Sequence, residues 1–238
     1  MAQTKYKRIL LKLTGELFGP ENGLGIDFSR VQRVANHLKH LKKNFEVEIA
    51  IVLGGGNLFR GRDVSDSKVD RAQADYAGML GTIMNALILQ GELEVLGVET
   101  RVMSSLEVKQ ACEPYFRRKA LAHLDRGIII ILAGGSGAPF FTTDTTAALK
   151  AAELNCDILL KGSNVDGVYD KDPKKDPQAV KFLELSYQEA LEKGLIVMDN
   201  TAFAICQSQK IPTIVFNIGD LENIDRLLKG ERIGTLIQ

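Results

Sequence analysis

Three glycine-rich segments in the sequence have the composition of phosphate-binding loops. They are Lys12–Gly15, Gly54–Asn57 and Gly134–Gly137, and each follows an apolar run typical of a strand. Glycine lets the backbone approach phosphate oxygens and adopt positive φ, so that its amide groups can surround an anion. One such loop could be no more than a tight turn. Three of them at the carboxyl edge of a parallel sheet, where ligands of open α/β sheets bind, predict a site for a polyphosphate.

Charged and hydroxyl side chains accompany these loops. Lys12 could place its ammonium on the β- and γ-phosphates of a nucleotide, and Arg60 and Arg62 could clamp a phosphate. The alternatives are a strand-end lysine that reaches water and two solvated arginines. The segment Phe140–Asp144 puts two hydroxyls and a carboxylate at a predicted helix start, either as an N-cap or as an acceptor site in which Asp144 orients a lysine or Mg²⁺.

Other polar residues have simpler interpretations. Asp166, Asp170 and Asp172 are typical of turns, which we favour over a metal site. His37 and His40 lie one helical turn apart without a carboxylate to complete a site, so we expect a solvated face, and His123 has no evident partner.

Several motifs of nucleotide and covalent chemistry are absent. The sequence has no Gly-Lys dipeptide, which excludes the P-loop, and no GxGxxG, which disfavours a dehydrogenase. No nucleophile, histidine and acid occur in a recognisable arrangement. Transfer onto an existing phosphate oxygen or carboxylate needs positioning and charge neutralisation rather than a strong base, so it fits this set of residues.

Short apolar runs alternate with helical periodicity, which predicts parallel strands joined by crossover helices. The chain should form a three-layer αβα sandwich around a largely parallel sheet, as a single domain over 1–238. Asp27 should cap a helix with a buried stripe, a long helix should run from about Asp75 to Leu96, and another should begin near Thr145. Val165–Gln178 should form a hairpin or flap, followed by a strand at Val180–Leu185. The predicted sheet strands are Arg8–Leu13, Val47–Leu53, Thr100–Met103, Ile128–Ala133, Ile158–Lys161 and Thr213–Asn217. The residues of the buried stripe are Phe28, Val31, Ala35, Leu38 and Leu41.

Composition limits the function classes. The 238 residues are 45% hydrophobic, enough for a sizeable core, and 30 basic residues cancel 30 acidic ones. No global field therefore favours nucleic acid as the main partner. The longest apolar run is too short to span a bilayer, and three scattered cysteines fit reduced core residues. We expect a soluble, cytoplasmic protein without a membrane partner.

Six segments together resemble bacterial uridylate kinases of the amino acid kinase superfamily, in order over essentially the whole chain. The resemblance implies transfer of the ATP γ-phosphoryl group to UMP, giving UDP in pyrimidine nucleotide biosynthesis, with Mg²⁺ held mainly by the phosphates rather than by protein ligands. The segments are Tyr6–Glu16, Gly54–Gly61, Asp75 with Gly78–Asn85, Pro139–Asp144, Lys161 with Val165–Tyr169, and Val197–Asp199.

The resemblance also implies a role for individual residues, with UMP on the side of about 1–150 and ATP on the side of about 151–238. Lys12 and Arg60 would neutralise charge, and Asp144 and Asp199 would organise the site. The ATP-binding residues would be Lys12, Leu13, Thr14, Gly15, Gly56, Arg60, Ser163, Tyr169 and Asp172. The UMP-binding residues would be Gly55, Asp75, Ser136, Gly137, Ala138, Pro139, Phe140, Phe141, Thr142 and Thr143.

Regulation is a further implication of the resemblance. Many members of the family are homohexamers that GTP activates and UTP inhibits. Thr14 replaces the commoner serine of its loop and keeps the hydroxyl. The residues that resemble effector positions are Gly23, Leu24, Gly25, Ile26, Asp27 and Arg101.

Two other functions stay open. A carboxylate or carbamate kinase of the superfamily would share the fold but lack the Asp75 helix and the Phe140–Asp144 string. A non-catalytic nucleotide-binding regulatory protein would not need Lys12, Arg60, Asp144 and Asp199 together.

Overall fold

The computed structural model describes residues 4–59, 69–173, 175–195 and 197–238. Within them, one nine-stranded sheet has the order β4-β3-β5-β2-β1-β6-β10-β11-β9. Its strands are β1 (Arg8–Leu13), β2 (Glu48–Leu53), β3 (Thr100–Ser104), β4 (Glu113–Pro114), β5 (Ile129–Ala133), β6 (Ile158–Ser163), β9 (Glu184–Leu185), β10 (Thr213–Asn217) and β11 (Thr235–Ile237). The helices are α1 (Phe28–Asn44), α2 (Arg71–Val95), α3 (Arg117–Asp125), α4 (Thr143–Glu153), α5 (Tyr187–Glu192), α6 (Asn200–Gln209) and α7 (Glu222–Leu228), with a 3₁₀ turn, η1, at Gly15–Leu17.

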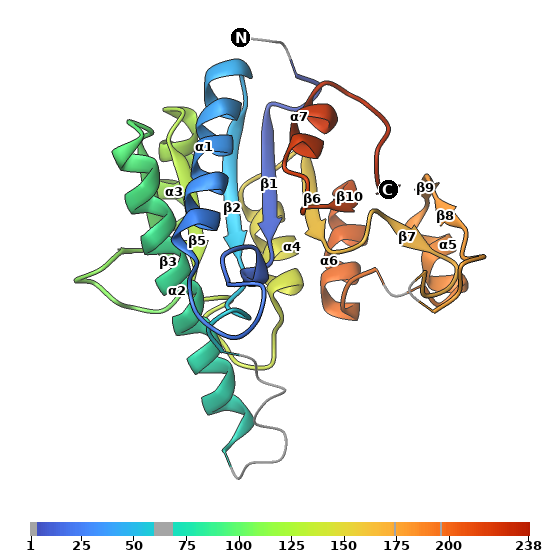
Figure 1. Cartoon of the computed structure of the whole chain (residues 1–238), viewed down its shortest axis with the longest axis horizontal. Coiled ribbons are helices and arrows are strands. Elements are labelled where there is room, and N and C mark those ends of the chain that lie inside the picture. The colour runs from blue at the N-terminus through green and yellow to red at the C-terminus, as the bar shows by residue number, and fades with distance from the viewer. Residues whose placement is uncertain (1–3, 60–68, 174, 196) are drawn as a thin grey trace.

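The sheet is parallel except where β11 meets β10. The central strands therefore end at one edge, at the bottom of Figure 1, and the N-terminal end of α2 projects beyond it. All six predicted sheet strands are confirmed to within two residues at each end. The three glycine-rich loops follow β1, β2 and β5, so they share this edge.

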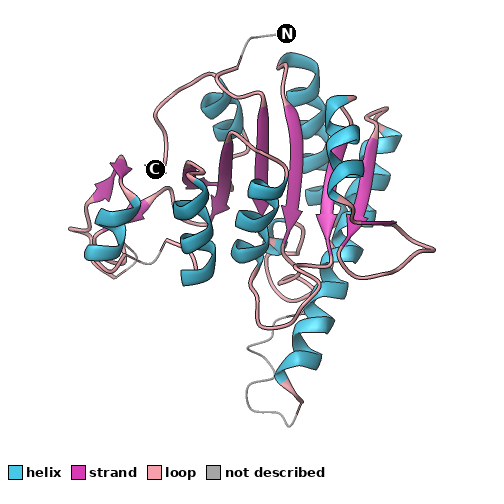
Figure 2. Cartoon of the chain, turned by 180° about the vertical axis from the view of Figure 1, so that it is seen from behind, coloured by secondary structure: helices cyan, strands magenta, loops and turns pink. Residues whose placement is uncertain are grey.

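Helices cover both faces of the sheet, which confirms the predicted three-layer sandwich. In β1, Ile9 and Leu11 belong to the apolar cluster under α1, α2 and α7, whereas Leu10 belongs to the cluster under α3, α4 and α6. All three side chains are fully buried. Figures 1 and 2 show these two layers from opposite sides. The consecutive apolar residues of the strand arise because both of its faces are packed.

The helix starts were predicted with mixed success. Asp27 caps α1 through the amides of Ser29 and Arg30, as expected. Phe28 is 57% exposed, so its place in the buried stripe is wrong. A helical period shows which residues share a face, but it does not show how far the neighbouring elements extend beneath them. The long helix begins four residues before the expected Asp75, at Arg71.

The hairpin is confirmed, since β7 (Val168–Tyr169) pairs antiparallel with β8 (Lys181–Phe182). The single strand predicted at Val180–Leu185 is wrong, because this segment divides between two sheets. Its first part pairs with β7 and its second part, β9, pairs with β11. Between them Leu183 is 65% exposed. An apolar run cannot show that its two halves have different neighbours.

The expectations for the histidines are partly wrong, because the His40 side chain is 54% exposed but that of His37 only 14%, and all three histidines lie near a carboxylate. His37 Nε2 and His40 Nε2 each lie 2.9 Å from one carboxylate oxygen of Asp225, which α7 brings to α1. His123 Nε2 lies 3.2 Å from Glu113 Oε2. In each case the carboxylate comes from a different element, and only the packing of the helices and strands brings it near.

The cluster of His37 and Asp225 predicts a pH effect on stability. Burial lowers the pKa of His37, although Asp225 opposes this, with His40, Asp220 and Glu222 acting from nearby. The unfolded chain therefore takes up this proton first as the pH falls. The stabilisation is complete above the ordinary histidine pKa of about 6.5 and is lost below it.

The melting temperature of the wild type should fall between about pH 7.5 and pH 5.5. We expect the melting temperature of His37→Asn to fall less over the same range. Thermal unfolding followed by circular dichroism measures this. Equal falls in wild type and variant would contradict the assignment of the proton to His37.

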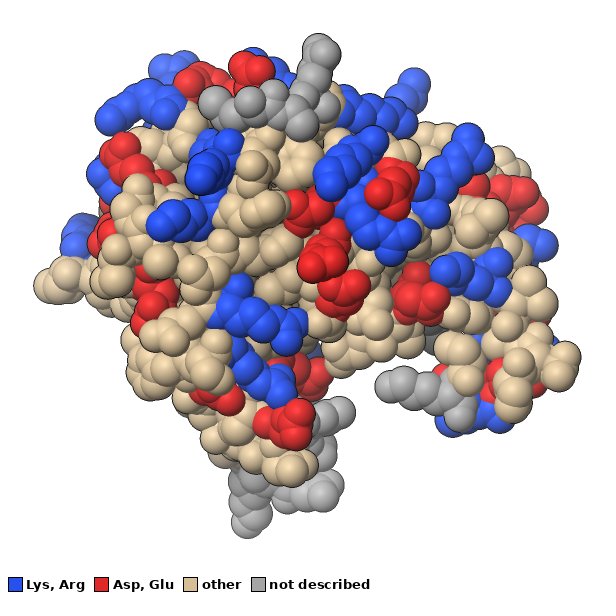
Figure 3. Space-filling view, turned by 45° about the horizontal axis from the view of Figure 1, so that its top comes forward, with Lys and Arg blue, Asp and Glu red and all other residues tan. Residues whose placement is uncertain are grey.

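The cysteines, the helix lengths and the surface charge bear on the expectations drawn from composition. All three cysteines are free, and Cys156 and Cys206 are buried. No helix of the described chain is both long and apolar enough to cross a membrane. Basic and acidic side chains intermingle on the face shown in Figure 3, without a large area of one sign.

Candidate active site

Two lysines lie next to each other near the carboxyl ends of the central strands. Lys12 of β1 and Lys161 of β6 are partners in the parallel register of these strands. Asp144, in the first turn of α4, contacts both: its Oδ1 is 3.0 Å from Lys12 Nζ and its Oδ2 is 2.5 Å from Lys161 Nζ. Each of the three side chains is less than 20% exposed. The alternative of a lysine that merely reaches water is therefore wrong for Lys12.

Two ammonium groups and nearby carboxylates set the electrostatics of this cluster. Burial alone would raise the pKa of Asp144, but the ammonium groups of Lys12 and Lys161 hold it below its ordinary value. Burial lowers the pKa of Lys161, and Asp144 opposes that change. Asp144 is therefore ionised at neutral pH, and one carboxylate faces two ammonium groups. Asp199 also acts on Lys161, so the two lysines are balanced by carboxylates, and their ammonium groups are held at the sheet edge where a polyphosphate could bind.

The N-cap interpretation of the α4 start is confirmed and Asp144 does contact lysines, while an acceptor site at these hydroxyls stays a prediction. Thr142 is the N-cap, with its hydroxyl accepting from the amides of Asp144 and Thr145. The same hydroxyl donates to Asp199. Asp199 in turn caps α6 and accepts from the Thr145 hydroxyl at 2.9 Å. Asp144 contacts the lysines directly, whereas Asp199 ties the starts of α4 and α6 together.

The first two glycine loops interlock through their backbones. A Cβ on Gly15 would lie 2.7 Å from both Gly54 O and Gly56 N. Gly54 N donates to Leu13 O at 2.9 Å. Gly15 must therefore be glycine for packing, independently of any ligand. A Cβ on Gly56 would meet no described atom within 4 Å.

The third loop contains most of the residues expected to bind UMP, and Asp75 is bound to it. Gly134, Gly135, Gly137 and Phe140 all have positive φ, between 56° and 80°. Asp75 Oδ2 accepts from Phe140 N at 2.8 Å, and its Oδ1 accepts from Arg71 Nε at 2.9 Å. The structure thus brings Asp75 to the loop that the sequence analysis grouped with it. Ser136, Gly137, Ala138, Pro139, Phe140, Phe141, Thr142 and Thr143 are all at least partly exposed.

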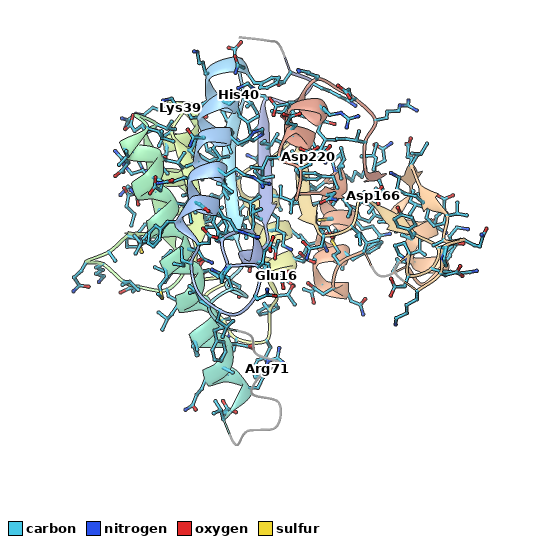
Figure 4. The ribbon with its side chains drawn as sticks, in the orientation of Figure 1. Glu16, Lys39, His40, Arg71, Asp166 and Asp220 are labelled. Atoms are coloured by element: carbon cyan, nitrogen blue, oxygen red, sulfur yellow. The ribbon has the colours of Figure 1, made fainter. Side chains whose placement is uncertain are left out.

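Three of the residues expected to bind ATP line one cavity of about 390 Å³ beside the hairpin. Ser163, Tyr169 and Asp172 border it together with Lys161. The Tyr169 hydroxyl donates to Asp166 at 2.6 Å. Figure 4 shows Glu16 near the carboxyl ends of the central strands, with Arg71 farther along α2 and Asp166 toward the hairpin. In the space-filling view the surface is notched between these two sides (Figure 3).

The other predicted positions either lie outside the described residues or belong to other parts of the described structure. Arg60 and Arg62 lie outside the described residues. Gly23 and Leu24 line a separate cavity of about 660 Å³ that also borders Thr14. Arg101 lies on β3, three strands from β1 in the sheet order, and pairs with Glu99 at 3.1 Å. Leu13 is buried at the end of β1, Gly25 accepts from Asn57, Ile26 packs against the core and Asp27 caps α1.

Lys161 has no predicted role among the site residues expected from the sequence. Its signal was present, because it follows the apolar run Ile158–Leu160 much as Lys12 follows Ile9–Leu11. What the sequence lacked was the pairing of β1 with β6, which sets the two lysines in register. Lys161 Nζ also donates to Val197 O at 2.5 Å, so it links β6 to the segment before α6.

The chain is similar to known proteins in both sequence and structure. The sequence model of the Amino acid kinase family matches residues 7–217. A uridylate kinase of Oenococcus oeni is 51% identical over 100% of this chain and 99% of its own length. The UMP kinase structures of Bacillus anthracis and Ureaplasma parvum have TM-scores of 0.94 and 0.92 at 38% and 35% identity. They cover 98% of this chain and 96% and 99% of theirs. The chain belongs to the amino acid kinase family.

Proposed function

We propose that the chain is a UMP kinase, which transfers the γ-phosphoryl group of ATP to UMP and releases UDP and ADP. The contact of Asp144 with both Lys12 and Lys161, at the edge shared by the glycine loops, carries this proposal. The full-length similarity to proteins named uridylate kinase supports the choice of acceptor.

The reaction needs no general base on the protein. An oxygen of the UMP phosphate, already anionic, attacks the γ-phosphorus, and the bond to the oxygen that bridges the β- and γ-phosphates breaks. Lys12 meets the negative charge of the transferring group, and Arg60 would add a second positive charge. Asp144 keeps both lysines at the edge of the sheet, and Asp199 holds the start of α4 through Thr142 and Thr145. Catalysis then rests on positioning and on charge neutralisation.

Mg²⁺ fits this site as an ion bound mainly by the phosphates of the nucleotide. The described residues contain no group of three or more His, Cys, Asp or Glu side chains with ligand geometry. Both oxygens of Asp144 face lysines and both of Asp199 face hydroxyls. Phosphate and water oxygens would therefore supply most of the coordination, and the ion would neutralise charge on the β- and γ-phosphates.

The two substrates would approach from opposite sides of the lysine pair. UMP would lie on the side of about 1–150, along Gly55, Asp75 and 136–143. ATP would lie on the side of about 151–238, with adenosine in the cavity beside the hairpin and phosphates near Lys12–Gly15 and Gly56. The central sheet common to both sides supports a division within a single domain over 1–238.

A substrate panel tests the function. Release of ADP is measured with UMP, CMP, acetylglutamate and carbamate as acceptors, in the presence of Mg²⁺ and ATP. We expect turnover with UMP. Turnover only with a carboxylate or carbamate would establish the other kinase class. Nucleotide binding without turnover on any acceptor would establish the regulatory protein.

A homohexamer regulated by GTP and UTP extends the proposal. Tyr76, Leu80 and Met84 form an apolar stripe at every fourth residue along α2, and they are 42%, 50% and 52% exposed. A stripe of this kind on a long helix supports contact with another copy of the chain. Light scattering after gel filtration tests the assembly, and titration of GTP and UTP into the assay tests the regulation.

Thr235 provides a test of the ATP side. Its buried hydroxyl donates to Phe182 O at 2.5 Å and accepts from Val168 N at 2.8 Å, so it joins both hairpin strands to β11. We expect Thr235→Val to raise the KM for ATP about tenfold, because a buried amide and carbonyl lose their partner beside the adenosine cavity. The KM for UMP should stay within about twofold, and Thr235→Ser should restore ATP binding. A selective rise in the KM for UMP would contradict the placement of ATP.

A further inference from the structure

The inner face of α2 carries two buried polar side chains. Thr82 and Asn85 lie one helical turn apart and are 6% and 1% exposed. Asp75 lies two turns before Thr82, on the same side of the helix. Buried polar groups reduce stability unless they are hydrogen-bonded, so their partners show what these side chains hold.

Thr82 holds the start of the third glycine loop. Its hydroxyl accepts from Gly134 N at 2.9 Å and donates to Met79 O at 2.7 Å. Gly134 has φ of 73°, and a Cβ there would lie 2.6 Å from Ser104 Oγ. The loop that leads to the proposed UMP cradle thus begins in a close-packed turn whose buried amide has Thr82 as its partner.

Asn85 holds the second glycine loop. Its amide donates to Gly54 O at 2.9 Å and to Asn57 Oδ1 at 2.7 Å. Asn57 Nδ2 donates in return to Asn85 Oδ1 at 3.0 Å, which makes a reciprocal pair of amides. A Cβ on Gly55 would lie 2.6 Å from Gly78 O, so this loop packs directly on the backbone of α2.

We infer that Thr82 and Asn85 are positioning residues for phosphoryl transfer, through which α2 fixes the second and third glycine loops relative to each other. The inference rests on the proposed function. An in-line transfer requires the acceptor phosphate and the donor polyphosphate at a set separation, and displacements of about 1 Å can slow a reaction about 100-fold. One rigid helix bonded to both loops, and through Asp75 to Phe140 N, sets that separation.

Thr82→Val tests the inference because valine keeps the shape and removes the hydroxyl. We expect the KM for UMP to rise about tenfold while the KM for ATP stays within about twofold, since the loop that moves is the acceptor loop. Thr82→Ser should restore the KM for UMP. Thr82→Val should thus affect mainly the KM for UMP, whereas Thr235→Val should affect mainly the KM for ATP. The difference arises because the Thr235 hydroxyl lies beside the proposed ATP cavity.

Thr100→Val is the matched control. Thr100 is a fully buried threonine at the beginning of β3, away from the carboxyl edge, and its hydroxyl donates to Val98 O at 3.1 Å. We expect both KM values to be unchanged in this variant. Melting temperatures of the three valine variants show whether a kinetic effect follows from general destabilisation.

Asn85→Asp tests the inference with a second variant, so the test does not depend on whether Thr82→Val folds. The change keeps the size of the side chain but turns a carboxylate oxygen toward Gly54 O and Asn57 Oδ1, so we expect kcat to fall about tenfold, with the melting temperature measured alongside. Equal changes in both KM values for Thr82→Val, or wild-type kinetics for Asn85→Asp, would overturn the inference. Failure of the wild type to form UDP would instead overturn the proposed function, so the two failures are distinguishable.

Discussion

Replacement of Lys12 by alanine is expected to lower kcat about 100- to 1,000-fold and to leave the KM for UMP within about threefold. Lys12 Nζ lies 3.0 Å from Asp144 Oδ1, at the edge where the phosphates would bind. Charge on the transferring phosphoryl group is stabilised most effectively by groups already in place before reaction. Loss of the ammonium therefore affects the transition state more than the bound acceptor.

The variant should fold, because Asp144 keeps its contact with Lys161 at 2.5 Å. Steady-state kinetics with each substrate varied in turn measures the effect, and circular dichroism checks the fold. Lys39→Ala is the matched control, since Lys39 is an exposed lysine on α1 (Figure 4). An unchanged kcat in Lys12→Ala would refute the assigned role, and a rise confined to the KM for UMP would move Lys12 to the acceptor side.

The second large effect is expected at Asp75. Asp75→Asn should raise the KM for UMP about 10- to 100-fold and change the KM for ATP less than about threefold, because a hydrogen bond to a charged group is worth more than one to a neutral group. The carboxylate accepts from Phe140 N at 2.8 Å and is paired with Arg71, so it lies at the loop proposed to cradle UMP. Asparagine keeps one acceptor oxygen but loses the charge and one acceptor.

Asp70→Asn is a suitable control for this variant. Asp70 caps the same helix through Ala72 N, and asparagine caps helices equally well. Its kinetics should therefore match the wild type. A selective loss of ATP affinity in Asp75→Asn would reverse the placement of the two substrates.

Local features of the sequence were sufficient for the strands and the glycine loops. Apolar runs such as Ile129–Ala133 are typical of strands packed on both faces, and glycines mark the turns that follow them. Asp27 was predicted as a cap because the capping bond involves residues only two and three positions away. Each of these signals depends on neighbours along the chain.

Contacts between distant segments could not be predicted in the same way. His40 and Asp225 are 185 positions apart and meet only because α7 packs beside α1. The strand expected at Val180–Leu185 failed because its halves pair with different partners. Asn57 and Asn85 lie in segments quoted for the family resemblance, yet nothing in those strings showed that their amides pair.

The sequence alone therefore indicates the edge of the sheet at which Lys12, the glycine loops and Asp144 gather, because strand ends and a helix start place them, whereas Asp75 was assigned through the family resemblance. Only the tertiary structure decided that Lys161 stands beside Lys12, that Asp144 contacts both, and that α2 holds two loops at once. The physical reason is that periodicity and turn chemistry are local properties. Strand order and register, by contrast, depend on the packing of the whole sheet between its two layers of helices.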